Sequence, residues 1–196
     1  YRYIPSPIRV GTNNVVSNLS NLVTIPNNLL QGDIKTAGVN TLRFVVNTTV
    51  GILGVFDTAA AIGFERQPKE DYGQTLGRLG MGPGCYVVLP ILGPSTVRDT
   101  AGTLANFVGG DPWFNVTVGN DTTYFNESDY YGTRITGGID FRAKNIESFE
   151  SLEENSIDFY ASIRSLYLQD RQQKILNSEK VTSTMDDSDW EEIESN

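Results

Sequence analysis

Residues 44–64, FVVNTTVGILGVFDTAAAIGF, carry a single charged side chain, Asp57. A segment this apolar has to be buried in a core or placed against a membrane. It is a poor spanning helix, because the uncharged part before Asp57 is short and Gly51 and Gly54 interrupt it. Two interpretations stay open. The segment is either two core helices broken at those glycines, or it lies at bilayer depth, half-immersed in one leaflet or beside a polar channel.

Apolar residues at helical spacing predict helices at both ends of the chain. The first follows Pro5 and Pro7 and is closed by Pro26. Its apolar stripe holds Ile8, Val15, Leu19 and Leu22, with Asn14, Asn18 and Asn21 largely off it. Asp33 is the expected N-cap of a second helix that begins at Ile34. Two long helices are expected near the other end, with stripes of Ile135, Ile139, Ile146, Phe149 and Leu152, then Phe159, Ile163, Leu166 and Tyr167. The scarcity of alternating patterns favours an all-α fold.

Residues 71–99 contain alternating glycines at Gly80, Gly82 and Gly84. A phosphate-binding loop is a weak interpretation, because no lysine follows and no strand pattern precedes them. The spacing favours a flexible hairpin whose apolar arm, Tyr86 to Pro90, is stiffened by prolines. Any short strand pair is expected near Cys85 to Leu92. Ser95 is then expected to cap a helix that runs to about Phe107.

The charge balance and the missing residue types exclude several classes of protein. A net charge of −9 disfavours binding to nucleic acid. The chain has no histidine, so the usual serine triad is impossible, and no metal or other cofactor is expected. The single cysteine, Cys85, is expected to be a small buried residue. An enzyme would have to use acidic residues such as Asp57, Asp71, Asp99 or Asp140, although Arg98 and Asp99 are more simply an ion pair. We therefore expect no catalysis.

Several sequence blocks, in order, resemble the MlaA/VacJ family of outer-membrane lipoproteins, which maintains lipid asymmetry. The likeness covers about residues 1–177 and departs from the family pattern at Cys85, where the family usually has proline. The lipid-modified cysteine of the family is not among these residues. The matching blocks are Tyr3 to Arg9 with Gly11, Asn18-Leu19, Leu29 to Gly32, Arg43-Phe44, Asn47-Thr48, Gly51, Gly54, Asp57, Tyr72 to Gly77, Gly80, Gly82, Gly84, Tyr86, Leu89-Pro90, Gly93 to Ser95, Arg98-Asp99, Ser156 to Tyr160 and Arg164 to Gln169.

The resemblance implies a ring-like, membrane-associated helical domain over residues 1–177, followed by an acidic, disordered tail over 178–196. Its expected function is to extract mislocalised phospholipid from the outer leaflet and pass it to a periplasmic carrier protein. The expected location is the periplasmic leaflet of the outer membrane, beside a trimeric porin, with a lipid anchor in the full-length precursor. The alternative is a non-catalytic structural lipoprotein that decorates porins. The expected site residues are the hairpin residues Gly80, Gly82, Gly84, Tyr86, Val88 and Pro90, and the channel-lining candidates Asn47, Thr48 and Thr49.

Overall fold

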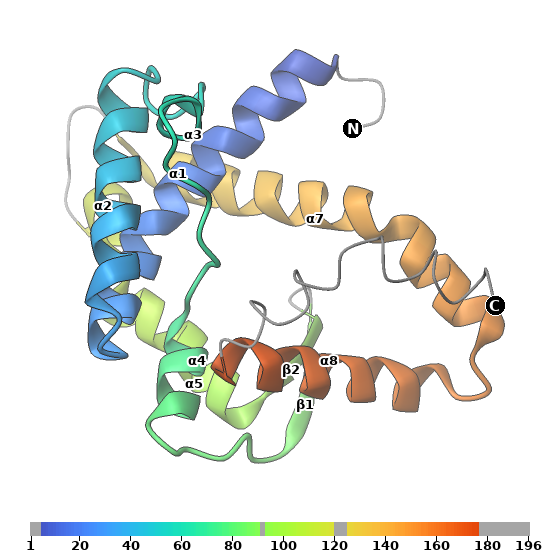
Figure 1. The fold of residues 1–196 in the computed structure, drawn as a ribbon. Coiled ribbons are helices and arrows are strands. Elements are labelled where there is room, and N and C mark those ends of the chain that lie inside the picture. Colours follow the sequence, from blue (N-terminus) through green and yellow to red (C-terminus); the bar gives the residue numbers. More distant parts are fainter. Residues whose placement is uncertain (1–4, 91–92, 120–124, 177–196) are drawn as a thin grey trace, which may run out of the picture.

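A computed structural model describes residues 5–90, 93–119 and 125–176, and the predicted acidic tail at 178–196 lies outside these ranges. The fold is mostly helical with one short two-stranded hairpin, which confirms the helical character expected from the sequence (Figure 1). The elements in chain order are α1 (Ser6–Leu30), α2 (Ile34–Thr49), α3 (Thr58–Ala61), α4 (Tyr72–Arg78), β1 (Tyr86–Leu89), β2 (Gly93–Thr96), α5 (Val97–Ala105), η1 (Asn106–Gly110), α6 (Pro112–Phe114), η2 (Asn115–Gly119), α7 (Glu127–Asn155) and α8 (Phe159–Leu176).

Helix α1 continues through Pro26 to Leu30, so the prediction that Pro26 closes it was wrong. An internal proline removes its own N–H from the helical ladder, and its ring crowds the carbonyl of the residue four positions earlier. The turns around it are reinforced by side chains, because the Thr24 hydroxyl and the Asn27 amide donate to backbone carbonyls one turn earlier. The chain then turns at Gly32, which has a φ of +79°, and α2 begins where predicted. The Asp33 side chain accepts a hydrogen bond from the backbone N–H of Thr36 at 3.0 Å.

The apolar segment after α2 forms a tight turn over residues 50–56 and then the short helix α3. A side chain at Gly51 would lie 2.3 Å from the carbonyl oxygen of Phe56, so the turn requires glycine there. Ile52 and Leu53 both adopt the left-handed region, at φ of 51° and 56°, which is rare for bulky residues. Their side chains are 64% and 65% exposed. The turn therefore presents two apolar side chains outward.

The hairpin lies between α4 and α5. Its strands β1 and β2 are antiparallel, with Tyr86 opposite Thr96 and Leu89 opposite Gly93. The second strand lies wholly beyond the predicted Cys85 to Leu92 region, because the hairpin extends to Thr96, which caps α5; residues 91 and 92 lie outside the described ranges. Thr96, one residue after the predicted Ser95, caps α5 by accepting from the N–H of Asp99.

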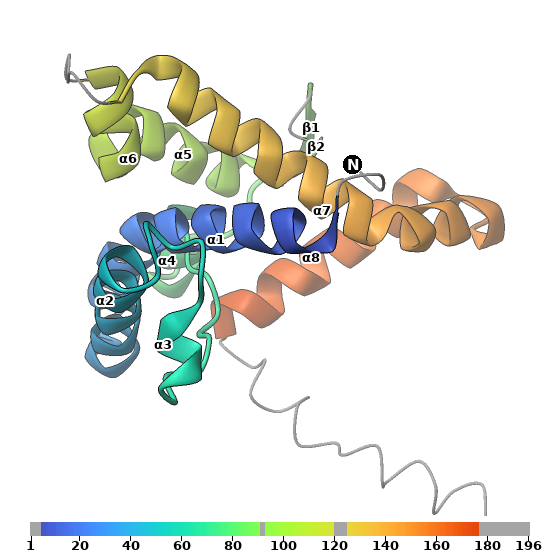
Figure 2. The ribbon, with the colours of Figure 1, turned by 90° about the horizontal axis from the view of Figure 1, so that it is seen from above.

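Helices α7 and α8 are both present as predicted, and they are joined by a short connection at residues 156–158. In Figure 1, α8 returns from this connection toward α4 and α5, and Figure 2 shows α7 passing close to α1. Ile135 and Ile139 on the predicted α7 stripe are exposed, and the side chain of Phe149 lies outside the described part of the chain. Neither these two helices nor any other described helix has the length and hydropathy needed to cross a bilayer.

The distribution of polar and apolar side chains is inverted relative to a protein that folds in water. In the described part of the chain, the buried hydrophobic side chains are those of Ala37, Ala59, Tyr130 and Ile175. Large apolar side chains such as Val50, Phe56 and Ile62 are exposed instead. The buried polar and charged residues are Asn18, Asn21, Thr24, Asn27, Asn28, Asn40, Arg43, Asn47, Glu70, Gln74, Thr75, Ser95, Thr96, Arg98, Asp99, Asp111, Thr117 and Asp140.

Candidate functional site

Two polar cavities adjoin the extended segment that links α3 to α4, since both are lined by Gln67, Pro68 and Lys69 of that segment. The first, which we call the basic cavity, has a volume of about 290 Å³. It contains three cationic side chains and one carboxylate. Its lining residues are Asn14, Ser17, Asn18, Asn21, Asn40, Arg43, Asn47, Asp57, Arg66, Gln67, Pro68 and Lys69.

Asp57 organises one wall of the basic cavity. Its carboxylate accepts two hydrogen bonds from Arg43, at 2.8 and 3.0 Å, and one from Arg66 at 2.7 Å. Asn47 donates to the same carboxylate at 3.0 Å, and it also accepts from the backbone N–H of Ala59. Burial alone would raise the pKa of Asp57, but the hydrogen bonds from Asn47, Arg66 and Arg43 outweigh burial and lower it to about 2. Asp57 is thus a fixed anion that locks α2 to the linking segment.

Asparagines from α1 also line the basic cavity. Asn14, Asn18 and Asn21 follow one another at offsets of four and three residues, which places them on one helix face. We call them the asparagine ladder. Arg66 donates to Asn14 Oδ1 at 2.9 Å, and Lys69 donates to Asn21 Oδ1 at 2.5 Å and to the carbonyl of Ser17 at 2.8 Å.

The middle member of the ladder, Asn18, differs from its neighbours. Its side chain is buried, at 4% exposure, and its Nδ2 donates to Thr48 Oγ1 at 2.9 Å. Its Oδ1 is buried and has no hydrogen-bond partner among the described residues. The pKa of Lys69 is lowered to about 8, first by burial of the ammonium and then by the nearby charges of Arg43 and Arg66. The basic cavity thus concentrates positive charge beside an unused acceptor.

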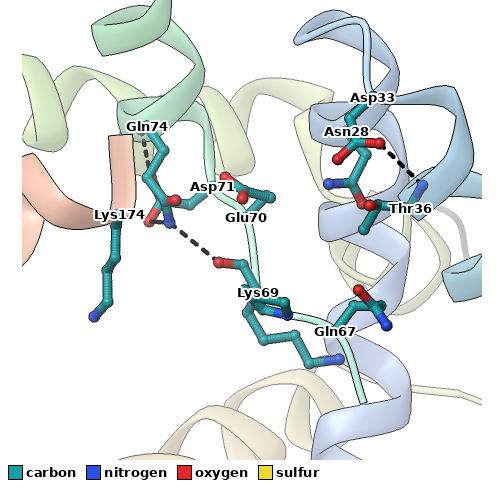
Figure 3. A pocket seen from close by; sticks show the side chains of 10 residues that line it. Asn28, Asp33, Thr36, Gln67, Lys69, Glu70, Asp71, Gln74 and Lys174 are labelled. Carbon is teal, nitrogen blue, oxygen red and sulfur yellow. Dashed lines mark hydrogen bonds between the residues drawn. The ribbon is translucent and has the colours of Figure 1, made fainter. Parts of the chain in front are cut away.

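The second cavity, which we call the acidic cavity, has a volume of about 310 Å³ (Figure 3). Asp33, Glu70 and Asp71 supply carboxylates, and Lys69 and Lys174 supply ammonium groups. Figure 3 shows Gln74 donating to the carbonyl of Lys69, which ties the linking segment to α4. The pKa of Glu70 is raised, chiefly by burial, although Gln31 donates to its carboxylate at 3.0 Å.

A buried ion network fixes α8 against α4 and α5. Arg171 donates to Asp71 at 2.7 and 2.9 Å and to Asp99 at 3.1 and 3.0 Å. Tyr167 donates to Asp99 Oδ2 at 2.7 Å, and Arg98 donates to Asp99 Oδ1 at 3.0 Å, which is the ion pair considered above. Burial would raise the pKa of Asp99, but its hydrogen bonds from Arg98, Arg171 and Tyr167 lower it to about 2. Burial and the Asp99 contact raise the pKa of Tyr167.

The hairpin residues contact α8. The ring of Tyr86 packs edge-on against Tyr160 and Tyr167, at 5.7 and 6.1 Å between centroids, and the Arg164 guanidinium lies 6.0 Å from its centroid. Val88 is 58% exposed. Before the strands, Gly80 and Gly84 have φ values of +92° and +68°. Pro90 and Gly82 are exposed.

An apolar groove of about 690 Å³ lies between α1, α7 and the turn that contains Val55 and Phe56. Ile8, Val15 and Val16 line it from α1. The groove is separate from the polar cavities.

The structure brings some of the predicted residues together and separates others. Asn47 lines the basic cavity. Thr48 does not line it, but its hydroxyl accepts a hydrogen bond from Asn18, which does. Thr49 is exposed, and its hydroxyl donates to the carbonyl of Val45. Cys85 is exposed, so the expectation of a buried thiol was wrong. It lies immediately before β1, in the exposed loop that connects α4 to the hairpin.

Sequence reasoning missed Arg43, Arg66 and Lys69 as site residues. The signal that was available is the asparagine spacing on α1, since amides repeated at four and three residues mark a polar face. In the described ranges, no group of three His, Cys, Asp or Glu side chains is placed to hold a metal ion.

A helical body with polar cavities inside and apolar side chains outside defines a class of protein suited to an apolar environment, such as the lipid-handling proteins. The MlaA lipoprotein family model matches residues 1–174, and the chain belongs to this family. The family is one of non-catalytic lipid-transport lipoproteins, in agreement with the expectation that the chain is not an enzyme.

Relatives and a solved structure agree with this assignment. The chain is 32% identical to the intermembrane phospholipid transport system lipoprotein MlaA of Haemophilus influenzae, over 92% of this chain and 69% of that protein. It is 33% identical to the protein of the same name in Escherichia coli K12, over 85% and 63%. The chain thus spans about two thirds of the length of these relatives. A structure solved in work on the structural basis for maintenance of bacterial outer membrane lipid asymmetry matches with a TM-score of 0.76 and 30% identity, over 89% of this chain and 83% of that one.

Proposed function

We propose that this chain binds phospholipid and moves it through its polar interior at the periplasmic leaflet of the outer membrane. It would extract phospholipid misplaced in the outer leaflet and pass it to a soluble periplasmic carrier. The names of the relatives, which are intermembrane phospholipid transport lipoproteins, support this class of substrate.

The inverted polarity is the observation that carries the proposal. Unpaired polar groups in hydrocarbon cost several kcal/mol, so a headgroup needs a polar, wet path. The basic and acidic cavities offer such a path, with buried side chains such as Asn21, Arg43 and Glu70 around them. The exposed side chains of Val50, Ile52 and Leu53 would contact the acyl chains of the surrounding leaflet.

The proposed setting is a ring-like body seated in the leaflet beside a trimeric porin, with a lipid anchor in the full-length precursor. The path of α8, which leaves the end of α7 and returns to α4, supports such a closed shape (Figure 1). The porin would bind the outer apolar surface. The carrier would receive lipid from the periplasmic side.

The proposed gate is the hairpin with its glycine-rich approach, Gly80, Gly82 and Gly84, and its arm, Tyr86, Val88 and Pro90. The left-handed backbone at Gly80 and Gly84 supports a hinge, because glycine adopts these angles at little cost. The contacts of Tyr86 with α8 would hold one position of the arm. Among the proposed channel-lining residues, Asn47 has the strongest support because it lines the basic cavity, and Thr48 and Thr49 follow it on α2.

Transfer of fluorescent phospholipid tests the function. The purified chain would be placed in nanodiscs, and the lipid reaching the periplasmic carrier would be measured with and without it. We expect faster transfer with the chain present, and stoichiometric phospholipid in material purified in mild detergent. Porin binding without lipid or transfer would favour the structural alternative, a porin-associated lipoprotein.

A further inference from the structure

The three asparagines of the ladder differ in their hydrogen-bond partners: the side-chain oxygens of the first and last accept from cations, and that of the middle one has no partner among the described residues. Arg66 occupies its first position, Asn14, and Lys69 occupies its last, Asn21. These positions are seven residues apart, which is about 10 Å along a helix axis. Asn18 lies between them on the same face, so its side chain is flanked by two cations that come from the linking segment.

Both cations retain hydrogen-bonding capacity. A guanidinium has five N–H donors, and Arg66 uses Nε for Asp57 and Nη2 for Asn14. An ammonium has three donors, and Lys69 uses two of them, for the carbonyl of Ser17 and for Asn21 Oδ1. An anion between Arg66 and Lys69 would therefore find charged donors on two sides.

Asn18 supplies the opposite kind of group. Its buried Oδ1 has no partner among the described residues, and buried acceptors are nearly always satisfied. An acceptor cannot bind an anion, so this oxygen calls for an N–H or O–H donor. A ligand that satisfies the whole site has to carry a negative charge and a donor within a few bonds of each other.

We propose that Arg66, Lys69 and Asn18 form a headgroup site for phospholipids whose alcohol carries a hydrogen-bond donor. The phosphodiester lies between Arg66 and Lys69, and the ethanolamine ammonium or the glycerol hydroxyl donates to Asn18 Oδ1. This inference rests on the proposed function and names its substrate class. Choline has no N–H, so phosphatidylcholine leaves Asn18 unsatisfied and binds more weakly.

The first experiment uses the unmodified protein and measures the competition of three phospholipids for binding. The full chain in mild detergent is offered equal amounts of phosphatidylethanolamine, phosphatidylglycerol and phosphatidylcholine with identical acyl chains, and the bound lipid is counted by native mass spectrometry. We expect the first two to exceed the third by about fivefold, the effect of one hydrogen bond. Equal retention of all three overturns the proposal.

A variant and its matched control locate the preference. Asn18→Ala should bring the ratio between ethanolamine and choline lipids to about one without lowering total phospholipid. Asn155→Ala removes an exposed asparagine at the end of α7, whose amide bonds only Ser151 in the described structure, and should leave the ratio unchanged. A ratio that survives in folded Asn18→Ala overturns the role of Asn18.

The basic pair is tested against a lipid without phosphate. Lys69→Met and Arg66→Met should each lower the binding of every phospholipid about tenfold relative to diacylglycerol. Glycerophosphoethanolamine and inorganic phosphate, which carry no acyl chains, should compete only weakly. If they bind as tightly as the lipid, the site belongs to soluble phosphates and the proposal is wrong.

The two proposals fail in different ways. A chain that retains and transfers phospholipid without headgroup preference contradicts the headgroup site alone. A chain that neither retains nor transfers any phospholipid contradicts the proposed function and with it this inference.

Discussion

Arg171 Nη2 and Asp99 Oδ1 lie 3.0 Å apart although their residues are separated by 72 positions, and this contact joins α8 to α5. Asp71 on α4 binds the same guanidinium, so one cation holds three helices. The two aspartates would repel each other without it.

Replacing this cation should destabilise the fold strongly. Arg171→Met removes the cation that Asp71 and Asp99 share and leaves Asp99 with Arg98 and Tyr167, so we expect a loss of about 3 kcal/mol in the free energy of unfolding. Urea denaturation in detergent measures it. The matched control is Lys174→Met, which removes an exposed pair with Asp170 and should cost less than about 0.5 kcal/mol. Equal effects would show that the network carries no special stability.

Acid should destabilise the protein in a defined window. The pKa values of Asp57 and Asp99 are about 2 in the folded state, below the ordinary value of 3.8. The unfolded chain therefore binds more protons between about pH 4 and pH 2, and stability falls as the pH is lowered through this range. Glu70 changes the stability in the opposite direction, because its pKa is raised in the folded state and its protonation at low pH favours folding.

Thermal unfolding between pH 6 and pH 2 measures this dependence. Asp57→Asn should lower stability at pH 6 and make the decline toward pH 2 shallower. A profile that stays flat from pH 5 to pH 2 in the unmodified protein would contradict the ion-pair assignments.

The turn at residues 50–56 should contribute to membrane binding. Leu53→Glu places a charge on an exposed apolar side chain, and we expect about a tenfold loss of co-sedimentation with phospholipid vesicles. Asn155→Glu adds the same charge to an exposed polar helix end and should change binding little. Unchanged binding of Leu53→Glu would remove this turn from the membrane contact.

Locking the hairpin should stop lipid transfer. In a Cys85→Ser background, Tyr86→Cys and Tyr160→Cys place thiols on β1 and α8, where the two rings now meet. A reducible bifunctional reagent should halt transfer to the carrier, and reduction should restore it. The same protein without reagent is the control. If the cross-linked protein moves lipid as fast as the control, the hairpin is a static scaffold.

Local features were predictable from the sequence because their chemistry involves neighbouring residues. Asp33 caps α2 as expected, since an N-cap needs only a side chain and an N–H three residues later. The cap of α5 was misplaced by one residue because Ser95 and Thr96 can both serve. The glycine-rich region indicated a hairpin for the same local reason.

Tertiary features were not predictable in this way. The contact between Arg171 and Asp71 spans 100 residues, and no local pattern marks it. The assignment of Cys85 to the interior assumed that apolar and small residues point inward. Here Asn18 and Asn21 of the asparagine ladder are buried, and apolar residues such as Ile52 are exposed.

This inverted interior affects how stability responds to temperature. Hydration of newly exposed apolar surface raises the heat capacity on unfolding, whereas hydration of polar surface lowers it. Unfolding this body exposes buried amides, hydroxyls and ion pairs, whereas apolar side chains such as Leu53 and Phe56 are already accessible. The heat-capacity increment should therefore be small for a chain of this length, and the stability curve nearly straight. Soluble domains gain most of their folding free energy by burying apolar side chains in their own core. This molecule would gain it by placing its apolar side chains in the surrounding lipid.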